Sequence, residues 1–516
     1  MKHLSNQRLR ACLIVLFWLI LWQAGAWITD NSILLVGPFE VIRALAALLR
    51  ESGFWLSAFT SFAKISLGFL GAFILGILLG WLAFHFSFLQ EFLAPVMTFL
   101  KSVPVASFVI LALIWAGSKN LSVLIAFLVV LPIIYVNTIA GLSSTDRKLL
   151  EMAQVFSIGR WQKIRFLYWP ALLPYLTSAC RTALGMSWKS GVAAEVIGVP
   201  DNTIGEGLYM SKIYLDTAGL FAWTLVIILA SGLFERLFLL LLAQTGKGLR
   251  GFRRSVPFWP GMRSRLSQPS PPPVLSIERL HKTYDGAEVL AGLTLTLTPN
   301  KPWCIMAPSG FGKTTLFRIL LGLETADSGR VQWMHAQGFA KKESSQMEAG
   351  LGGSTEAAGG SANGRDIPPR ISAVFQEDRL CEAFSPIDNI RLAVPGLSRT
   401  AIAAELKQVL PEECLNRPVS TLSGGMKRRT AIMRAMLFPS AAVIMDEPFT
   451  GLDEETKALV IRYIRKNSRG KLLLLSTHQE EDVELLNGIS VRLNDVLPLE
   501  PVKTLTNAMA NGTLTE

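Results

Sequence analysis

The sequence predicts an all-α bundle of six transmembrane spans joined to an α/β domain in one chain of 516 residues. Two observations carry this prediction. Half of the residues are hydrophobic and only 17% are charged, and the long apolar runs lie before about residue 245. Short strand-like runs that end in glycine-rich or acidic segments gather after residue 274. We therefore expect a membrane domain over residues 1–245 and a soluble domain over residues 274–500.

Six apolar runs are each long enough for the ~20 residues that cross the core of a bilayer. The first run follows a short basic segment and could by itself be a signal peptide. Because five more runs follow it, we interpret it as a retained span. The runs cover about Ala11–Ile28, Leu56–Phe86, Phe92–Ala116, Leu121–Leu142, Ala171–Val199 and Leu220–Ala243.

The net charge of +11 comes largely from basic residues beside these runs. Lys and Arg that flank spans stay on the cytoplasmic side, so the pattern predicts a multi-pass protein of the cell membrane with a cytoplasmic soluble domain. The same pattern argues against a nucleic-acid partner. The five cysteines are widely separated and have no metal-ligand spacing. The flanking basic residues are Lys2, Arg8, Arg10, Arg147, Lys148, Arg160, Lys163, Arg165, Lys247, Arg250, Arg253 and Arg254.

The fifth run carries three ionisable residues, Arg181, Lys189 and Glu195. Such groups cost at least ~2.5–3.5 kcal/mol at the centre of a membrane helix. They could form a polar lining for an anionic or polar solute. They could also form an internal ion pair or lie near the interface and reach water, and we favour this second interpretation.

Three segments do not fit a packed domain. Residues 246–273 are basic and then rich in Pro and Ser, which is typical of a linker. Residues 335–369 are rich in Gly, Ser, Ala and Glu and predict a disordered insertion, which could be regulatory or neutral. Residues 501–516 form a tail.

A candidate phosphate-binding loop follows the strand-like run 303–306. Its backbone N–H groups would point at phosphate oxygens, as at the start of a helix. Lys313 would neutralise the phosphates and the Thr314 hydroxyl would ligate Mg²⁺. Ala307 stands where the pattern G-x-x-x-x-G-K-[ST] has Gly, at a cost of ~1–2 kcal/mol if that position needs a positive φ. The nucleotide-binding candidates here are Ser309, Gly310, Gly312, Lys313, Thr314 and Thr315.

A second apolar run, 442–445, ends in Asp446 and Glu447. A buried strand of this kind delivers two carboxylates to a phosphate site. Asp446 would hold Mg²⁺, and Glu447 would act as the general base that polarises the attacking water.

A third motif, Leu422-Ser423-Gly424-Gly425-Met426, lies between these two. A Ser N-cap followed by two glycines makes another phosphate-binding surface. In this order, the motifs resemble those of ABC ATPases, whose signature is usually written LSGGQ. Members of the family bind ATP and Mg²⁺, and the signature of one subunit contacts the nucleotide of another.

The resemblance implies roles for four further positions. Gln376 matches the Q-loop, which senses the metal and faces the permease. Residues 451–453 match the D-loop, and His478 matches the switch histidine. Tyr284 stands where the family stacks an aromatic ring on adenine. The expected catalytic set is therefore Glu447, His478 and Gln376, the expected metal ligands are Thr314, Asp446 and Gln376, and the expected signature residues in trans are Ser423, Gly424 and Gly425.

The loop 146–174, after the fourth span, contains Glu151-Met152-Ala153, Gly159 and Pro174. It resembles the EAA loop of binding-protein-dependent ABC importer permeases, although Met152 replaces the usual Ala. In that family a short helix of the loop docks on the ATPase, which gives Glu151, Ala153, Gly159 and Pro174 a coupling role. An ordinary amphipathic interfacial helix would show a similar pattern. The run 188–195 also resembles nitrate/sulfonate/taurine-type permeases.

Together the resemblances imply half of an ABC importer for a small solute, in particular an anion such as nitrate, a sulfonate or taurine. The half would pair with a second copy or a paralogous half. A separate extracellular or periplasmic solute-binding protein would deliver the solute. Alternatives are an ABC exporter half, import of a thiamine-precursor-like metabolite, a non-transporting signalling protein with a degenerate ATPase, and a soluble ATPase fused to an unrelated anchor.

Overall fold

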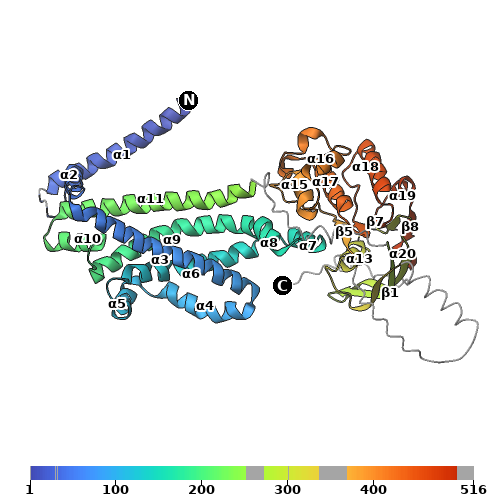
Figure 1. The fold of residues 1–516 in the computed structure, drawn as a ribbon, viewed down its shortest axis with the longest axis horizontal. Helices are drawn as coiled ribbons and strands as arrows, with labels where there is room; N and C mark the ends of the chain where they lie inside the picture. Colours follow the sequence, from blue (N-terminus) through green and yellow to red (C-terminus); the bar gives the residue numbers. More distant parts are fainter. Residues whose placement is uncertain are drawn as a thin grey trace, which may run out of the picture. The chain divides into compact units, whose positions relative to one another are not determined.

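The computed structural model describes residues 2–29, 31, 33–250, 272–299, 301–308, 310–335 and 369–496. The chain forms two compact units (Figure 1). The helical unit comprises residues 1–145 and 164–249, and the α/β unit comprises residues 146–163 and 250–516. Most of the expected linker, the expected insertion, the tail and Ser309 lie outside the described residues.

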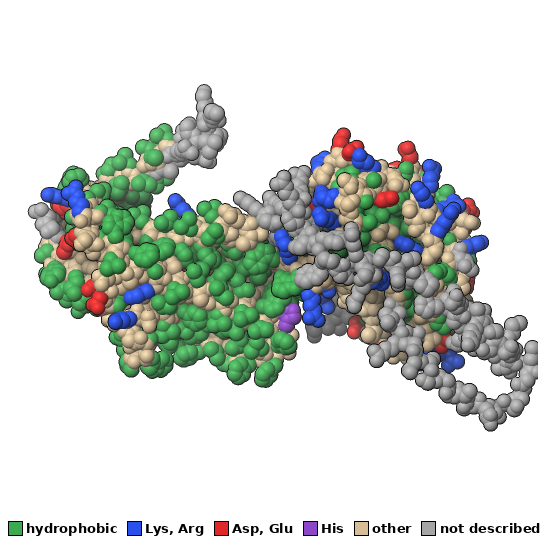
Figure 2. Space-filling model, viewed as in Figure 1, with side chains coloured by type: hydrophobic (Ala, Val, Ile, Leu, Met, Phe, Trp, Pro, Cys, Tyr) green, Lys and Arg blue, Asp and Glu red, His purple; other side chains and the backbone are tan. Residues whose placement is uncertain are grey.

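The described helical unit contains helices throughout, as the long apolar runs predict. The surface that Figure 2 shows over this unit is mostly apolar, in contrast to the mixed charges over the α/β unit. The elements are α1 (Lys2–Thr29), α2 (Pro38–Leu48), α3 (Ser52–His85), α4 (Ser87–Ser102), α5 (Val105–Ala116), α6 (Leu121–Ser143), η1 (Ile164–Tyr168), α9 (Trp169–Gly198), α10 (Ile204–Ile213) and α11 (Thr217–Arg250).

Four described helices are long and apolar enough to cross a membrane, namely α1, α3, α6 and α11. The third expected span is instead a pair of helices, α4 and α5, bent by 108°. The bend follows from Pro104, because a residue before proline favours extended backbone, and Val103 has φ −73° and ψ 126°. The fifth expected span corresponds to α9, which has 30 residues but does not meet the same apolarity criterion.

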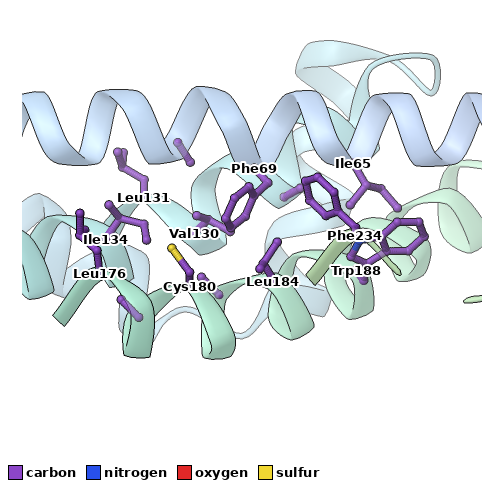
Figure 3. Close-up of a cluster of buried hydrophobic side chains, with 14 of the residues drawn as sticks. Ile65, Phe69, Val130, Leu131, Ile134, Leu176, Cys180, Leu184, Trp188 and Phe234 are labelled. Carbon is purple, nitrogen blue, oxygen red and sulfur yellow. The ribbon is translucent and has the colours of Figure 1, made fainter. Parts of the chain in front are cut away.

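The core of the helical unit lies between α3, α6 and α9 (Figure 3). Glycines on α3 let α6 approach closely. A Cβ atom at Gly76 would lie 2.9 Å from Cβ of Ile134, and one at Gly80 would lie 2.7 Å from Cβ of Thr138. The small-residue positions of this span therefore serve helix packing.

The α/β unit contains two sheets. A three-stranded antiparallel sheet has the order β2-β1-β4, and a five-stranded parallel sheet has the order β5-β6-β7-β3-β8. The strands are β1 (Pro273–Tyr284), β2 (Ala287–Leu297), β3 (Trp303–Met306), β4 (Ser328–His335), β5 (Ile371–Val374), β6 (Ala442–Met445), β7 (Leu472–Ser476) and β8 (Ile489–Arg492).

Helices surround these sheets, and β3, β6 and β7 lie side by side in the parallel sheet. The carboxyl ends of parallel strands meet at one edge, which is where ligands bind in open α/β sheets. The helices are α7 (Arg147–Val155), α8 (Arg160–Lys163), α13 (Lys313–Leu320), α15 (Pro386–Ala393), α16 (Arg399–Leu406), α17 (Gly424–Leu437), α18 (Glu454–Asn467), α19 (Glu480–Leu486) and α20 (Leu493–Val496), with 3₁₀ turns η4 (Glu412–Cys414) and η5 (Val419–Thr421).

Candidate functional site

The candidate phosphate loop joins the end of β3 to the start of α13. Gly310 and Gly312 have φ values of +88° and +77°, a region that glycine reaches without steric cost. A Cβ atom at Gly312 would also lie 2.9 Å from both Cγ1 and O of Val289. Gly312 is therefore needed for its backbone conformation and for the close approach of β2.

Ala307 fits its position without strain. It is buried, and it is not among the residues with positive φ. The steric cost that a positive φ would impose on alanine does not arise here.

The side chain of Lys313 lies inside the loop. Its Nζ atom donates to the carbonyl oxygens of Ala307 and, at 3.1 Å, of Pro308. It lies 3.4 Å from Nε2 of His478. Burial lowers the pKa of Lys313, although the nearby carboxylates of Glu447 and Asp446 oppose this shift. The lysine is thus a buried cation that weak neutral acceptors hold beside the loop.

Asp446 is buried at the end of β6 and accepts two hydroxyl hydrogen bonds. Thr314 Oγ1 donates to its Oδ2 at 2.9 Å, and Ser476 Oγ donates to its Oδ1 at 2.7 Å. The sequence did not single out Ser476, because nothing in a strand-end serine distinguishes it from a structural residue.

A cavity of about 210 Å³ lies beside this carboxylate, and its lining includes Thr314, Gln376 and Asp446. The structure therefore brings the three expected metal ligands together. Their donors are oxygens, which suit Mg²⁺, an ion that binds few protein groups and keeps water and phosphate oxygens. Among the described residues, no group of three or more His, Cys, Asp or Glu is arranged to hold a metal ion by itself.

Glu447 has a left-handed backbone, with φ +46°. A non-glycine residue in this region costs roughly 1–2 kcal/mol, and such outliers cluster at functional sites. The Glu447 N–H donates to Ser476 Oγ at 2.8 Å, and its Oε1 lies 3.0 Å from Nε2 of His478. The strained turn thus places the candidate base beside the candidate switch histidine.

Tyr284 lies at the end of β1 and is 40% exposed. Its hydroxyl donates to Glu324 and also lies within hydrogen-bonding reach of Thr315. Burial raises its pKa, and the hydrogen bond to Glu324 adds to this shift. These contacts place the tyrosine beside α13, the helix that follows the phosphate loop.

The candidate signature residues lie apart from the phosphate loop of the same chain. Ser423 caps α17 and accepts a hydrogen bond from the N–H of Met426 at 3.4 Å. Ser423 and Gly424 are exposed. Figure 1 shows α17 with α15 and α16, away from α13. Within one chain, the structure does not complete the nucleotide site with this motif.

The helix α7 belongs to the α/β unit although it comes from the loop between α6 and α9. Asp146 caps it by accepting from the N–H of Lys148 at 2.8 Å. Glu151 accepts two hydrogen bonds from Arg318, each 3.0 Å, and one of 2.6 Å from Arg379. Burial alone would raise the pKa of Glu151, but the hydrogen bonds and charges of the two arginines lower it.

Further contacts hold the same helix against the α/β unit. Gln154 Nε2 donates to the carbonyl of Gly322 at 3.2 Å, and Lys148 forms an exposed ion pair of 2.6 Å with Glu377. The ring of Phe156 packs edge to face against Phe438, with 5.2 Å between the centroids.

The remaining loop residues behave differently from one another. Met152 and Ala153 are fully buried. A Cβ atom at Gly159 would meet only Oε1 of Gln162, at 3.7 Å, so close packing does not require glycine there. Pro174 lies inside α9, in the other unit. The sequence missed Arg318 and Arg379, which lie far from Glu151 along the chain and carry no motif.

The ionisable residues of α9 do not form the internal ion pair that we favoured from the sequence. Glu195 is buried and accepts from Ser61 Oγ at 2.7 Å and from the N–H of Gly205 at 3.3 Å. Among the described residues, no ion pair involves Arg181 or Lys189, and both side chains lie on the exposed face of the helix.

Two families match the chain. The family described as "ABC transporter" matches residues 290–450, and "Binding-protein-dependent transport system inner membrane component" matches residues 72–245.

Two similar curated proteins each match less than half of the chain. "Nod factor export ATP-binding protein I" of Ralstonia nicotianae is 31% identical over 43% of this chain and 66% of its own length. "Spermidine/putrescine import ATP-binding protein PotA" of Hahella chejuensis is 28% identical over 41% of this chain and 54% of its own length. The chain thus spans just under two thirds, or less, of these relatives.

A solved structure, a dimeric bacterial ABC transporter cassette, is 22% identical over 42% of this chain and 94% of that chain, with a TM-score of 0.33. That score is too low to support a structural argument. The two family matches agree with the two units of the fold. The chain therefore joins, in one polypeptide, a membrane domain of the binding-protein-dependent transport type and an ATPase domain of the ABC transporter type.

Proposed function

We propose that this chain is one half of an ATP-driven importer, in which residues 1–245 form the membrane domain and residues 274–500 form the ATPase domain. Residues 246–273 would link the two domains, with an insertion over 335–369 and a tail over 501–516. The observation that carries the proposal is the set of three hydrogen bonds that Arg318 and Arg379 donate to Glu151. Arg318 lies on the helix that follows the phosphate loop, and Arg379 lies just after Gln376. A helix from the membrane domain's loop is thus attached to elements that would move with the nucleotide.

The geometry supports specific roles at the nucleotide. Lys313 would exchange its two carbonyl acceptors for phosphate oxygens, which are stronger partners for a buried cation. Thr314, Asp446 and Gln376 would hold Mg²⁺, whose charge would offset that of the phosphates when it is bound. The glycines of the loop, with Ser309 and Thr315, would bind phosphates, and Tyr284 would contact the adenine.

Glu447 is the proposed general base, and His478 is its proposed partner. The 3.0 Å separation of Glu447 Oε1 and His478 Nε2 allows the histidine to orient the carboxylate. Gln376 lines the same cavity as Asp446, so it can respond to the state of the phosphate site.

The exposed signature motif points to a second chain. Ser423, Gly424 and Gly425 would close over the phosphate loop of a partner, and the partner's motif would close over this one. The simplest partner is a second copy of this chain, and a paralogous half is the alternative. In such an assembly the ATPase domain faces the cytoplasm from a multi-pass membrane protein.

The direction of transport rests on the membrane domain. Its family is described as binding-protein-dependent, which supports import with a separate solute-binding protein outside the membrane. The names of the relatives include both export and import, and each relative matches about two fifths of the chain. An exporter is therefore the second candidate. We propose a small anion such as nitrate, a sulfonate or taurine as the solute, with a thiamine-precursor-like metabolite as the alternative.

The substitution Glu447→Gln tests the ATPase proposal. The full chain in proteoliposomes should still bind a fluorescent ATP analogue, whereas hydrolysis should fall by about 10²–10⁴-fold because a general base is lost. The matched control is Glu454→Gln, a change of the same type at an exposed position of α18. Undiminished turnover in the Glu447 variant would refute the assigned base.

Direction requires a transport measurement. Right-side-out vesicles that contain the full chain and are loaded with ATP should take up labelled nitrate or taurine only when a solute-binding protein is present in the medium. Efflux without any such protein would favour the exporter.

A further inference from the structure

Helix α9 has two faces of different chemistry. One face packs against α3 and α6, and Figure 3 shows Leu176, Cys180, Leu184 and Trp188 pointing into that core. The opposite face is exposed and carries polar and charged side chains at helical spacing. The exposed residues of α9 are Pro170, Pro174, Tyr175, Ser178, Arg181, Thr182, Met186, Lys189, Ala193 and Ile197, and the charged ones among them are Arg181 and Lys189.

The two cations of this face lie at the depth of the core. Cys180, the neighbour of Arg181, lies beside Phe69 and Val130, near the middle of α3 and of α6 (Figure 3). Lys189 follows Trp188, whose ring lies 5.8 Å from that of Phe62. Eight residues separate the two cations, or about 12 Å along the helix axis. Arg181 at least is thus far from both ends of the bundle, so a position near the interface does not explain it.

Neither cation has a partner among the described residues. The carboxylates of Glu195 and Glu206 have other hydrogen-bond partners. Glu195 is turned into the core, where it accepts from Ser61, and Glu206 accepts from the N–H of Asn202 at 2.6 Å. Lys64 of α3 lies near Glu195 and so offsets the charge of that carboxylate. The exposed face of α9 therefore carries two positive charges, Arg181 and Lys189, without a carboxylate partner among the described residues.

Lipid does not suit this face. The exposed positions of α3 at the same depth are apolar, including Leu67, Leu70 and Ile74, as contact with acyl chains requires. Charged side chains within a membrane domain usually face a protein interior or a water-filled cavity. The exposed face of α9 thus carries charged side chains where the exposed face of α3 is apolar. This difference is the one expected if α9 faces a water-filled path and α3 faces lipid.

We propose that Arg181 and Lys189 line the solute path of the assembled transporter and select a small anion. The inference rests on the proposed function, since a second copy would complete the path. The planar guanidinium of Arg181 can bind two oxygens of a sulfonate, nitrate or carboxylate at once, and Lys189 attracts an anion as a point charge. Gly185 between them leaves open space, because a Cβ atom there would meet nothing within 4 Å.

A cysteine reporter between the two cations tests this inference. Met186 is 43% exposed on the same face, and Cys12 is the exposed one of the five native cysteines. Each reaction rate is divided by the rate of the same reagent with a free thiol in solution, because a thiolate by itself favours the cationic reagent. On this scale, in a Cys12→Ser parent, Met186→Cys should react with a sulfonate-bearing methanethiosulfonate about tenfold faster than with its trimethylammonium analogue, because positive charge concentrates anions. The full chain is used in neutral phosphatidylcholine vesicles.

Two comparisons make the result decisive. Adding Arg181→Gln and Lys189→Gln to the reporter should bring the ratio of the two rates close to one. Ile74→Cys, on the exposed face of α3, should not react with either reagent. If Met186→Cys does not fold, Ala193→Cys replaces it on the same face.

The outcomes separate this inference from its alternatives. If neither Met186→Cys nor Ala193→Cys reacts, the anion path is refuted. It is also refuted if the anionic and the cationic reagent react equally fast with the reporter cysteine. Protection of the reporter by anionic lipid, without protection by nitrate or taurine, would overturn it in favour of a lipid headgroup. ATP hydrolysis is measured in the same vesicles. Lost hydrolysis with an intact charge preference would count against the proposed function alone, and lost preference with normal hydrolysis would count against the path alone.

Discussion

The two units of this chain hold buried charge in different ways. In the described part of the α/β unit, the buried charged side chains are Lys313, Arg428, Arg434, Asp446, Lys457 and Asp482. Three of these six are in ion pairs, Lys457 with Asp482 and Arg428 with Asp378, whereas Lys313, Arg434 and Asp446 have neutral hydrogen-bond partners. In the described part of the helical unit, Glu195 is the buried charged residue, and its hydrogen-bond donors are a hydroxyl and a backbone N–H.

The difference predicts different responses to substitution. When one member of a buried ion pair is removed, the other is left uncompensated, which is strongly destabilising. A buried charge that accepts hydrogen bonds from several neutral donors loses only one of these bonds when a single donor is removed. A single substitution in a buried ion pair of the α/β unit should therefore have a larger effect than one at the neutral partners of Glu195 in the helical unit.

The largest effect is expected for Lys457→Met. The substitution leaves Asp482 buried without its cation, at a cost of about 3–5 kcal/mol. The side chain of Asp482 is 3% exposed, so water cannot replace the lysine. Hydrogen exchange of α18 and α19 in the full chain measures the loss as faster exchange.

The double variant Lys457→Met with Asp482→Leu is the control. Removing both charges should recover most of the protection. Equal exchange in the single and double variants would show that lost packing, and not an uncompensated charge, explains the effect.

A smaller effect is expected for Glu151→Gln, which removes the negative charge of α7 that Arg318 and Arg379 bind. Hydrogen bonds to charged groups contribute about 1.5–3 kcal/mol, so the docked fraction of α7 should fall by roughly tenfold or more. Spin labels at Gln154 and Gly322, which are in contact in the structure, report docking through the broadening of their spectra. Lys148→Gln is the matched control, because its exposed ion pair should contribute under about 1 kcal/mol.

The same labels test a dependence on pH. Because the pKa of Glu151 in the folded chain lies below its ordinary value of 4.5, its contribution is complete at neutral pH. It is lost as the pH falls through the folded pKa, when the carboxylate takes up a proton. Docking should therefore weaken only at pH values below about 4.5, and Glu151→Gln should remove that dependence.

In the helical unit, Ser61→Ala should cost about 1–3 kcal/mol. The hydroxyl of Ser61 donates to Glu195 and accepts from the N–H of Ile204 at 2.8 Å, so the substitution removes two buried hydrogen bonds. Ser66→Ala is the matched control on the same helix, since the buried Ser66 hydroxyl has no hydrogen-bond partner among the residues that the structure describes. Thermal unfolding in detergent should separate the two variants. Equal melting temperatures would mean that Ser61 does not stabilise the carboxylate.

The smallest effect is expected for Ala307→Gly. Lys313, like Arg434, donates to neutral carbonyl oxygens, and one of its two acceptors belongs to Ala307. The backbone there has no positive φ, so glycine brings no relief and only adds freedom to the unfolded chain, at about 0.4–1 kcal/mol. ATP affinity should not improve. A clear gain would show that the bound state needs a backbone that alanine resists.

The sequence predicted what is local in the chain. The phosphate loop, the carboxylates after β6 and the signature motif are contiguous segments whose chemistry requires those residues. Arg318 and Arg379 were missed because they meet Glu151 only in the folded chain, at separations of 167 and 228 residues. Ser61 was missed for the same reason, since it reaches Glu195 across 134 residues.

The membrane domain was predicted less completely. Apolar runs identify helices, but they do not show which face of a helix is covered. The break before α5 could have been expected from Pro104, whose effect on Val103 is local. The outward direction of Arg181 and Lys189 could not, because it depends on how α9 packs against α3 and α6.

The chain crosses three times between its two units, so α7 is covalently tethered to the surface on which it docks. The chain passes from the helical unit to the α/β unit after Thr145, returns after Lys163 and crosses again after Leu249. Docking of α7 is therefore an intramolecular equilibrium, with an effective concentration of the order of millimolar for short connections. A helix of only nine residues can stay bound under such conditions, even if the same two surfaces on separate proteins would dissociate on dilution. One translation event also supplies both parts in a fixed ratio of one to one.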